Sequence, residues 1–203
     1  MSHNTWLHKV AGIIAKPLVK TPVTPNHITT IRLAIGLAAA AGMATGAPDW
    51  MNIAAALFFL SMVLDRADGV LARISGKISR VGHLYDLWSD AICNALIFVG
   101  LGFGLREGTH GPDAIIYGVI AGGSVTCVLC LVLKLENLSG ERAGEIGSFL
   151  GFDPDDAMLL VPIAIWLGWA EQVLLAASIG APFFAALFFI IFLYRRRSFK
   201  AKS

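Results

Sequence analysis

Charged side chains are scarce in this chain. Only 15% of its 203 residues are Asp, Glu, Lys or Arg, whereas 56% are hydrophobic. About a quarter of the residues in a soluble globular domain are charged, so this composition argues against a soluble protein and favours several membrane-spanning helices. The net charge of +2 is small, and no basic patch alternates with aromatic residues. We therefore expect no nucleic-acid partner.

Cysteine is also rare, with three residues in the whole chain. Cys127 and Cys130 form a CxxC pair, but no second pair of ligands accompanies it. Ordinary helix packing therefore explains these residues, and Cys93, better than zinc or redox chemistry does. Residues 1–27 lack the long apolar core and the small-residue cleavage pattern of a signal peptide, so we expect none there.

Long apolar segments dominate the rest of the chain. Six of them are apolar enough to be read as membrane-spanning helices, near residues 28–47, 50–74, 83–105, 114–135, 156–170 and 173–195. The fifth segment is shorter than the others. Residues 3–20 combine apolar positions at helical spacing with three lysines, a pattern typical of an amphipathic helix on a membrane surface. A frayed basic tail is the alternative for that stretch.

The predicted fold is therefore an all-α polytopic membrane protein, with six transmembrane helices and an N-terminal amphipathic surface helix. We expect three parts along the chain: an N-terminal cytoplasmic amphipathic segment at 1–27, a six-helix transmembrane domain at 28–195, and a basic cytoplasmic tail at 196–203. Small residues at helical spacing predict close packing of the first and third spanning helices: Gly36, Ala40 and Ala44 in the first, Gly100 and Gly104 in the third. Asn26 is expected to cap the first of them.

Basic residues fall almost entirely on one side of the predicted segments. The loops, termini and adjoining helix ends of that side hold fifteen of the sixteen Lys and Arg, Arg32 among them, and the other side holds only Arg106. The positive-inside rule then predicts that both termini are cytoplasmic. Trp50, Trp166 and Trp169 fall near the predicted outer interface, where indole rings commonly lie. The positive charge also predicts attraction to anionic membrane lipids.

Four aspartates gather between residues 65 and 90, in a chain that is otherwise poor in charge. Ionisable groups at membrane depth are costly and usually functional. At 100° per residue, one stripe of the second spanning helix holds Asp65, Asp68, Gly69 and Ala72. One stripe of the third holds Gly82, Asp86 and Asp90. We expect the two stripes to face one another near the cytoplasmic ends of their helices.

Carboxylates this close together must partly protonate or bind cations. Oxygen-only ligands suit Mg²⁺, Mn²⁺ or Ca²⁺ rather than zinc, and two such cations would match a diphosphate. Gly69 and Ala72 leave bare helix surface for a nucleotide base or a phosphate. Arg73 either holds a phosphate oxygen or balances the acids. Ion pairing of the aspartates with Arg66, Arg73, Lys77 and Arg80 is the structural alternative, but it explains neither the small residues nor the matching stripes.

The stretch from 65 to 90 resembles the signature of the CDP-alcohol phosphotransferases, D-x2-D-G-x2-A-R, eight or nine residues, then G-x3-D-x3-D. Every fixed position is present: Asp65, Asp68, Gly69, Ala72, Arg73, Gly82, Asp86 and Asp90. A looser resemblance extends to Pro25-Asn26-His-Ile-Thr29 and to six helices after a short surface helix. It implies an integral membrane enzyme that transfers a substituted phosphate group from a CDP-linked alcohol to a hydroxyl and releases CMP, with the help of two divalent cations, Mg²⁺ or Mn²⁺.

The same resemblance implies roles for individual residues. Asp65, Asp68 and Asp86 resemble metal ligands, and Asp90 resembles the general base with a metal contact of its own. Six residues match donor-binding positions: Asn26, Thr29, Gly69, Ala72, Arg73 and Ser79. Asn26 and Thr29 match less closely than the others. For a phosphorylated acceptor, the candidate basic residues are Lys134, Arg142 and Arg195, for which positive-inside anchoring is an equally good explanation.

The expected donor is CDP-diacylglycerol, in phospholipid synthesis at the cytoplasmic face of a bacterial inner membrane. Transfer of the CDP-choline or CDP-ethanolamine type to a lipid acceptor is the main variation. The resemblance also allows a homodimer. A cation transporter with intramembrane carboxylates is the alternative of another class, but such a protein would place its acids near the midplane and often show repeat symmetry. A catalytically silent, lipid-binding member of the family is a further alternative, and the intact motif argues against it.

Overall fold

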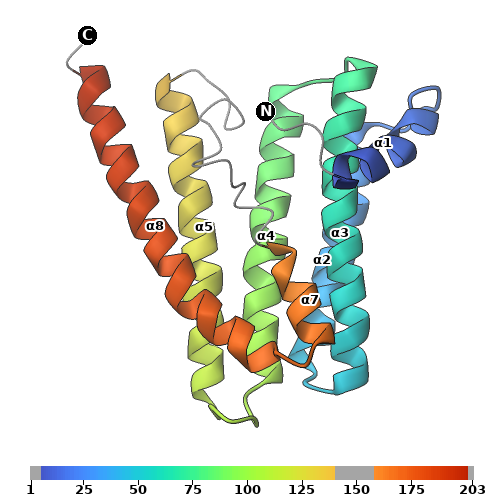
Figure 1. Cartoon of the computed structure of the whole chain (residues 1–203). Helices are drawn as coiled ribbons and strands as arrows, with labels where there is room; N and C mark the ends of the chain where they lie inside the picture. The colour runs from blue at the N-terminus through green and yellow to red at the C-terminus, as the bar shows by residue number, and fades with distance from the viewer. Residues whose placement is uncertain (1–5, 140–157, 201–203) are drawn as a thin grey trace.

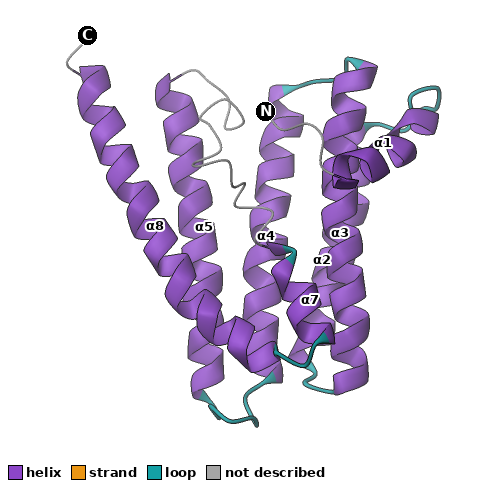
Figure 2. Ribbon diagram, viewed as in Figure 1, coloured by secondary structure: helices purple, strands orange, loops and turns teal. Residues whose placement is uncertain are grey.

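The computed structural model describes residues 6–139 and 158–200, and those residues form helices joined by short turns with no strand among them (Figures 1 and 2). The all-α prediction is confirmed for this part of the chain. Its elements are α1 (Trp6–Leu18), α2 (Pro25–Ala44), α3 (Pro48–Ser75), α4 (Arg80–Gly104), α5 (Asp113–Ser139), α7 (Leu160–Trp166) and α8 (Ala170–Lys200).

The long helices run along a common axis, and α1 lies across them near the end where α3 finishes (Figure 1). α2 packs against both α3 and α4, α4 packs against α5, and α5 packs against α8. α3 and α4 touch each other only lightly. A side chain from α2 is therefore well placed to connect groups that α3 and α4 carry.

Glycines set the close approach of α4 to its neighbours. A Cβ atom on Gly100 would collide with the backbone carbonyl of Ala40, and one on Gly36 would collide with Cys93 Sγ. Gly104 lies just as close to the carbonyl of Met43. The small-residue faces predicted for these two helices thus meet each other, as expected where helices pack without a hydrophobic driving force between them.

The largest apolar core lies among α2, α3, α4, α5, α7 and α8, around Met43, Phe58, Ile97 and Leu101. A second, smaller cluster joins α1 to the helices beside it through Ala15, Ile28 and Leu71. Leu18 of α1 also packs against this cluster, whereas Ile13 of the same helix is 72% exposed.

Four of the described helices are long and apolar enough to cross a membrane: Pro25–Ala44, Arg80–Gly104, Asp113–Lys134 and Ala170–Tyr194. The predicted count of six is not confirmed. α3 is 28 residues long but carries charged residues at both ends, including Asp49 and Arg73. α7 has seven residues and is followed by Gly168, whose φ of +76° ends the helical path.

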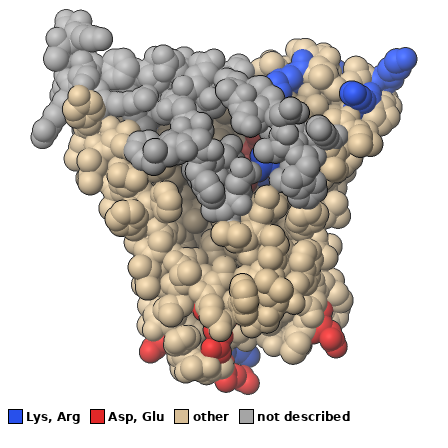
Figure 3. All heavy atoms as spheres, in the orientation of Figure 1, with Lys and Arg blue, Asp and Glu red and all other residues tan. Residues whose placement is uncertain are grey.

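Charge is distributed unevenly along the bundle axis. Figure 3 shows acidic side chains at the end where α3, α5 and α8 begin, and basic side chains at the opposite end near α1. Asp49, Asp113 and Glu171 occupy the first turns of those three helices. The positive-inside rule concerns Lys and Arg, so the basic end is the one to which it applies.

Candidate functional site

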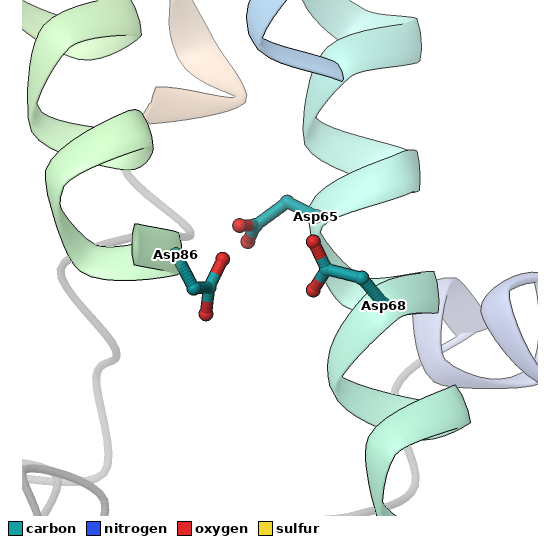
Figure 4. A group of neighbouring side chains, drawn as sticks. All are labelled: Asp65, Asp68 and Asp86. Atoms are coloured by element: carbon teal, nitrogen blue, oxygen red, sulfur yellow. The ribbon is translucent and has the colours of Figure 1, made fainter. Parts of the chain in front are cut away.

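Three aspartates from α3 and α4 point into a common space (Figure 4). One carboxylate oxygen from each of Asp65, Asp68 and Asp86 lies within 4.8 Å of the others. The side chain of Asp68 is 3% exposed, that of Asp65 27% and that of Asp86 35%. The two stripes predicted from helical spacing therefore do face one another at the same depth.

Asp90 lies one turn further along α4. Its Oδ1 accepts a hydrogen bond of 3.0 Å from Nδ2 of Asn94, a further turn on. Asn94 is buried, and the sequence motif does not include it. The amide fixes one oxygen of Asp90 and so orients the carboxylate.

Arg32 of α2 lies at the centre of all four carboxylates. Its Nη1 is 2.6 Å from Asp65 Oδ1 and 3.4 Å from Asp90 Oδ1. Its Nη2 is 2.9 Å from Asp86 Oδ1 and also donates to the Asp86 carbonyl oxygen at 2.8 Å. Nε lies 3.8 Å from Asp68 Oδ2 and has no hydrogen-bond partner.

The expectation that placed Arg32 at a helix end of the basic side did not include its burial. The residue is 1% exposed because its guanidinium is needed inside the bundle as a counter-charge. A signal was present in the sequence: Arg32 is the only Lys, Arg, Asp or Glu between residues 28 and 47. An isolated charge within an apolar helix calls for a buried partner.

Hydroxyl groups complete the inner part of the site. Thr29 is buried, and its Oγ1 donates to Asp68 Oδ2 at 2.7 Å. Ser61 donates to the carbonyl oxygen of Arg32 at 3.0 Å, which joins α3 to α2 at this depth. Thr29, which the family resemblance marks as a donor-binding position, thus contacts a predicted metal ligand directly.

Polar side chains also lie together at the first turns of α2 and α4, around Asn26, Ser79 and Gly82. We call this region the entrance. Ser79 is the N-cap of α4, and its Oγ accepts from the Gly82 backbone N–H at 2.9 Å. A Cβ on Gly82 would lie 2.9 Å from Ser79 Oγ and 3.0 Å from Asn26 Oδ1, so these three residues lie together. Gly82 therefore makes room for the two polar side chains.

The prediction that Asn26 caps α2 is wrong. Thr24 is the N-cap, because Pro25 takes the first helical position, for which its fixed φ is suited. The backbone N–H of Thr24 donates to His27 Nδ1 at 3.3 Å, which closes the cap. Asn26 is consequently exposed and is not used as a cap.

The outer face of α3 is bare beside the aspartates. In the described part of the chain, a Cβ atom on Gly69 would come within 4 Å of the Arg73 guanidinium alone, with its nearer nitrogen at 3.6 Å. Arg73 itself is exposed and Ala72 is half-buried. This surface has the open character that the small residues predicted.

A small pocket, partly open to solvent, adjoins the carboxylates. Its polar wall includes Arg32, Asp65, Asp90 and Asn94, and its apolar wall includes Phe58 and Met158. Of the three residues expected to hold a phosphorylated acceptor, only Lys134 has a described side chain, and it is not among the lining residues. Lys134 is exposed, Arg142 lies outside the described residues, and the side chain of Arg195 is not described.

Comparisons with known proteins agree with this geometry. The family model for CDP-alcohol phosphatidyltransferase matches residues 22–194. The chain is 32% identical to cholinephosphotransferase 1 of Mus musculus over 47% of this chain and 26% of that protein. It is 31% identical to archaetidylinositol phosphate synthase of Aeropyrum pernix over 68% of this chain and 66% of that protein. The chain thus spans less than two thirds of the length of these relatives.

Two crystal structures of phosphatidylinositol phosphate synthase from Mycobacterium tuberculosis share the fold. The structure with CDP-DAG bound has a TM-score of 0.67 and 20% identity, covering 94% of each chain. The structure in complex with manganese and citrate has a TM-score of 0.65 and 21% identity, covering 93% of this chain and 88% of the other. Because the family model covers the aspartate motif and nearly all the described helices, the chain belongs to the CDP-alcohol phosphatidyltransferase family.

Proposed function

We propose that this protein is a membrane enzyme that transfers a phosphatidyl group from CDP-diacylglycerol to an alcohol hydroxyl and releases CMP, in phospholipid synthesis. The observation that carries the proposal is the convergence of Asp65, Asp68 and Asp86, with Asp90 one turn deeper on the wall of an open pocket. Family membership supports the reaction class. The bound CDP-DAG of the M. tuberculosis synthase supports the choice of donor.

The carboxylate oxygens of the site suit divalent cations as ligands. Three carboxylates gather their oxygens within 4.8 Å, and no His or Cys belongs to the group, which favours Mg²⁺ or Mn²⁺. The same fold holds manganese in the M. tuberculosis synthase. We propose that Asp65, Asp68 and Asp86 hold the metal ions, with Asp90 as a further ligand. When bound, such ions neutralise diphosphate oxygens and stabilise the charge of a departing phosphate.

We assign the role of general base to Asp90. Asn94 occupies Oδ1, so Oδ2 is the oxygen that we assign to the acceptor hydroxyl. The hydroxyl oxygen attacks the β-phosphorus as Asp90 takes its proton, and the bond from that phosphorus to the bridging oxygen of CMP breaks. CMP leaves with the electron pair, and Asp90 later returns the proton to water. A base so placed contributes about 10²–10⁴-fold to the rate.

We propose that the donor nucleotide lies on the bare face of α3 and at the entrance. Gly69 and Ala72 let the base or the diphosphate approach the helix, and the exposed Arg73 guanidinium reaches over that face. Asn26 and Ser79 line the entrance. Thr29 acts on the donor through Asp68, since its hydroxyl is hydrogen-bonded to that carboxylate.

The acceptor is a small alcohol, with Lys134, Arg142 and Arg195 as candidate contacts for an acceptor phosphate. A second candidate reaction, transfer from CDP-choline or CDP-ethanolamine to a lipid alcohol, is favoured by the match to cholinephosphotransferase 1. The two reactions differ in which substrate carries the lipid, so a single panel of donors and acceptors separates them.

We also propose the following membrane arrangement. The segment 1–27 lies on the cytoplasmic surface with α1 against the lipid, 28–195 forms six spanning segments including α3 and the stretch around α7, and 196–203 is a basic tail. Both termini and the carboxylates face the cytoplasm of a bacterial inner membrane, and two copies form a dimer. The basic end near α1 and the acidic opposite end support this orientation (Figure 3).

The proposal is tested with purified protein in lipid nanodiscs. CDP-diacylglycerol or CDP-choline is supplied with Mn²⁺ or Mg²⁺ and a panel of acceptors: glycerol phosphate, inositol phosphate, inositol, serine and diacylglycerol. CMP release and the mass of the lipid product are measured. We expect metal-dependent CMP release with CDP-diacylglycerol and one acceptor. The absence of CMP release from either donor, with every acceptor, would contradict the proposed function.

A further inference from the structure

Arg32 is buried, unlike the other Lys and Arg whose exposure the structure describes. Its placement needs an explanation. It is 1% exposed, and it is the only Lys, Arg, Asp or Glu in α2. Its guanidinium contacts acids from two other helices. A buried charge is tolerated where it is paired and hydrogen-bonded, and here the partners are the same aspartates that the proposed function gives to the metal ions.

The contacts of Arg32 join two helices that hardly touch each other. Nη1 reaches Asp65 on α3 at 2.6 Å, and Nη2 reaches Asp86 on α4 at 2.9 Å. Figure 4 shows these two carboxylates pointing toward one another, and their distances to Nη1 and Nη2 place the guanidinium between them. Without a positive group there, the carboxylates of the two helices would repel one another.

The pairing is electrostatically incomplete. One guanidinium faces four carboxylates, so its single charge cannot balance them. Nε also lacks a hydrogen-bond partner, although Asp68 Oδ2 is 3.8 Å away. An unmade hydrogen bond at a buried donor is costly. Arg32 holds the acids together, but this arrangement leaves both charge and hydrogen bonding unsatisfied.

We propose that Arg32 is an internal counter-cation that keeps the four aspartates assembled before divalent ions bind, and that it competes with those ions for the oxygens of Asp65 and Asp86. Arg32 is thus a positioning residue. It preserves the separation of α3 and α4 in the metal-free protein and weakens metal affinity in exchange. This inference rests on the proposed metal site.

The test measures stability and metal affinity for wild type and Arg32→Gln. Thermal unfolding is followed in EDTA and at saturating Mn²⁺, and Mn²⁺ binding is titrated by the electron paramagnetic resonance signal of the free ion. In EDTA we expect Arg32→Gln to lower Tm by about 5–10 °C, because a buried pair is broken. At saturating Mn²⁺ the difference in Tm should shrink, and Kd for Mn²⁺ should fall about tenfold or more, because a competing charge is gone.

Lys77→Gln is the matched control, since it removes a positive charge from an exposed loop position outside the site. It should leave Tm and Kd unchanged. Arg32→Lys keeps the charge but loses the fork that spans two helices, so its Tm in EDTA should lie between those of wild type and Arg32→Gln. Should Arg32→Gln fail to fold even with Mn²⁺, Arg32→Lys must still bind Mn²⁺ more tightly than wild type, by a smaller factor.

Two results would overturn the inference. An equal loss of Tm with and without Mn²⁺, at unchanged Kd, would give Arg32 a purely structural role. Weaker Mn²⁺ binding in Arg32→Gln would make it a helper of the metal rather than a competitor. If wild type binds no Mn²⁺ at all, the failure belongs to the proposed function, so the two failures are distinguishable.

Discussion

The two ends of the α2–α3–α4 unit are held together by different physics. At one end, Arg32, Thr29 and the aspartates interact through charge and hydrogen bonds. At the other, Gly100 and Gly104 of α4 press against the backbone of α2, next to an apolar core around Phe58. Among the described residues, the apolar end has no buried side-chain nitrogen or oxygen without a hydrogen-bond partner, whereas the charged end leaves four acids with one cation. The tightly packed end therefore supports an end that is left unsatisfied for binding.

The comparison predicts that removing the charge of one aspartate at the charged end impairs function more than stability. Asp90→Asn keeps the shape and removes the base, so turnover should fall about 10²–10⁴-fold while Tm changes little. CMP release and thermal unfolding are measured on the same sample. Asp49→Asn, at the far end of α3, is the matched control and should retain full turnover. Unchanged CMP release in Asp90→Asn would eliminate Asp90 as the base.

Thr29→Val tests whether hydrogen bonding at the charged end supports metal binding. It removes the hydrogen bond to Asp68 Oδ2 at almost constant volume. Outer-shell partners of metal ligands contribute about 10–100-fold to metal affinity, so Mn²⁺ should bind weaker by that factor. The same titration on Thr126→Val, whose hydroxyl donates to the carbonyl oxygen of Gly122 within α5, should show no change. Equal Mn²⁺ affinity in Thr29→Val and wild type would show that this threonine does not support the metal site.

Gly100→Ala tests the close packing of α4 against α2 at the apolar end. The added Cβ meets the carbonyl of Ala40 on α2, and overpacking of this kind costs about 1–3 kcal/mol. Tm should therefore fall, by similar amounts with and without Mn²⁺. Gly123→Ala, in α5 with open space around its Cβ, should instead gain up to about 1 kcal/mol from helix propensity. A loss of stability that Mn²⁺ reverses in Gly100→Ala would show that the two ends are coupled.

The smallest expected effect is at the entrance. Ser79→Ala removes the side chain that accepts from the Gly82 N–H at the start of α4, and loss of such a cap costs about 1 kcal/mol. Thermal unfolding measures the change, with Ser124→Ala, whose hydroxyl bonds a carbonyl within α5, as the control. If Ser79 also contacts the donor, KM for CDP-diacylglycerol rises in addition. An unchanged Tm would remove the capping role.

Much of the site follows from spacing alone. Residues three and four apart share one face of a helix, so Asp65 and Asp68 had to project together, and so did Asp86 and Asp90. Small residues such as Gly36 and Gly100 likewise indicated where helices approach closely. These inferences hold because helical geometry is local and the residue types leave few alternatives.

Two element boundaries differ from the prediction. Asn26 was a reasonable cap by residue type, yet Thr24 caps α2 because Pro25 fixes where the helix begins. That signal is local, so the cap was open to sequence reasoning. The segment expected at 156–170 forms a helix of only seven residues in its described part, and the apolar pattern alone did not show where that helix ends.

The sequence by itself determined the helical class, the motif and the two stripes of carboxylates, because each depends on short-range spacing. Only the tertiary structure decided what lies between those stripes. Arg32 is thirty-three or more positions before the acids that it contacts, and α2 brings it between them by packing against both α3 and α4. Charge interactions act through space and not along the chain, so a cation expected only as one of the basic residues of one side proved to be the centre of the site.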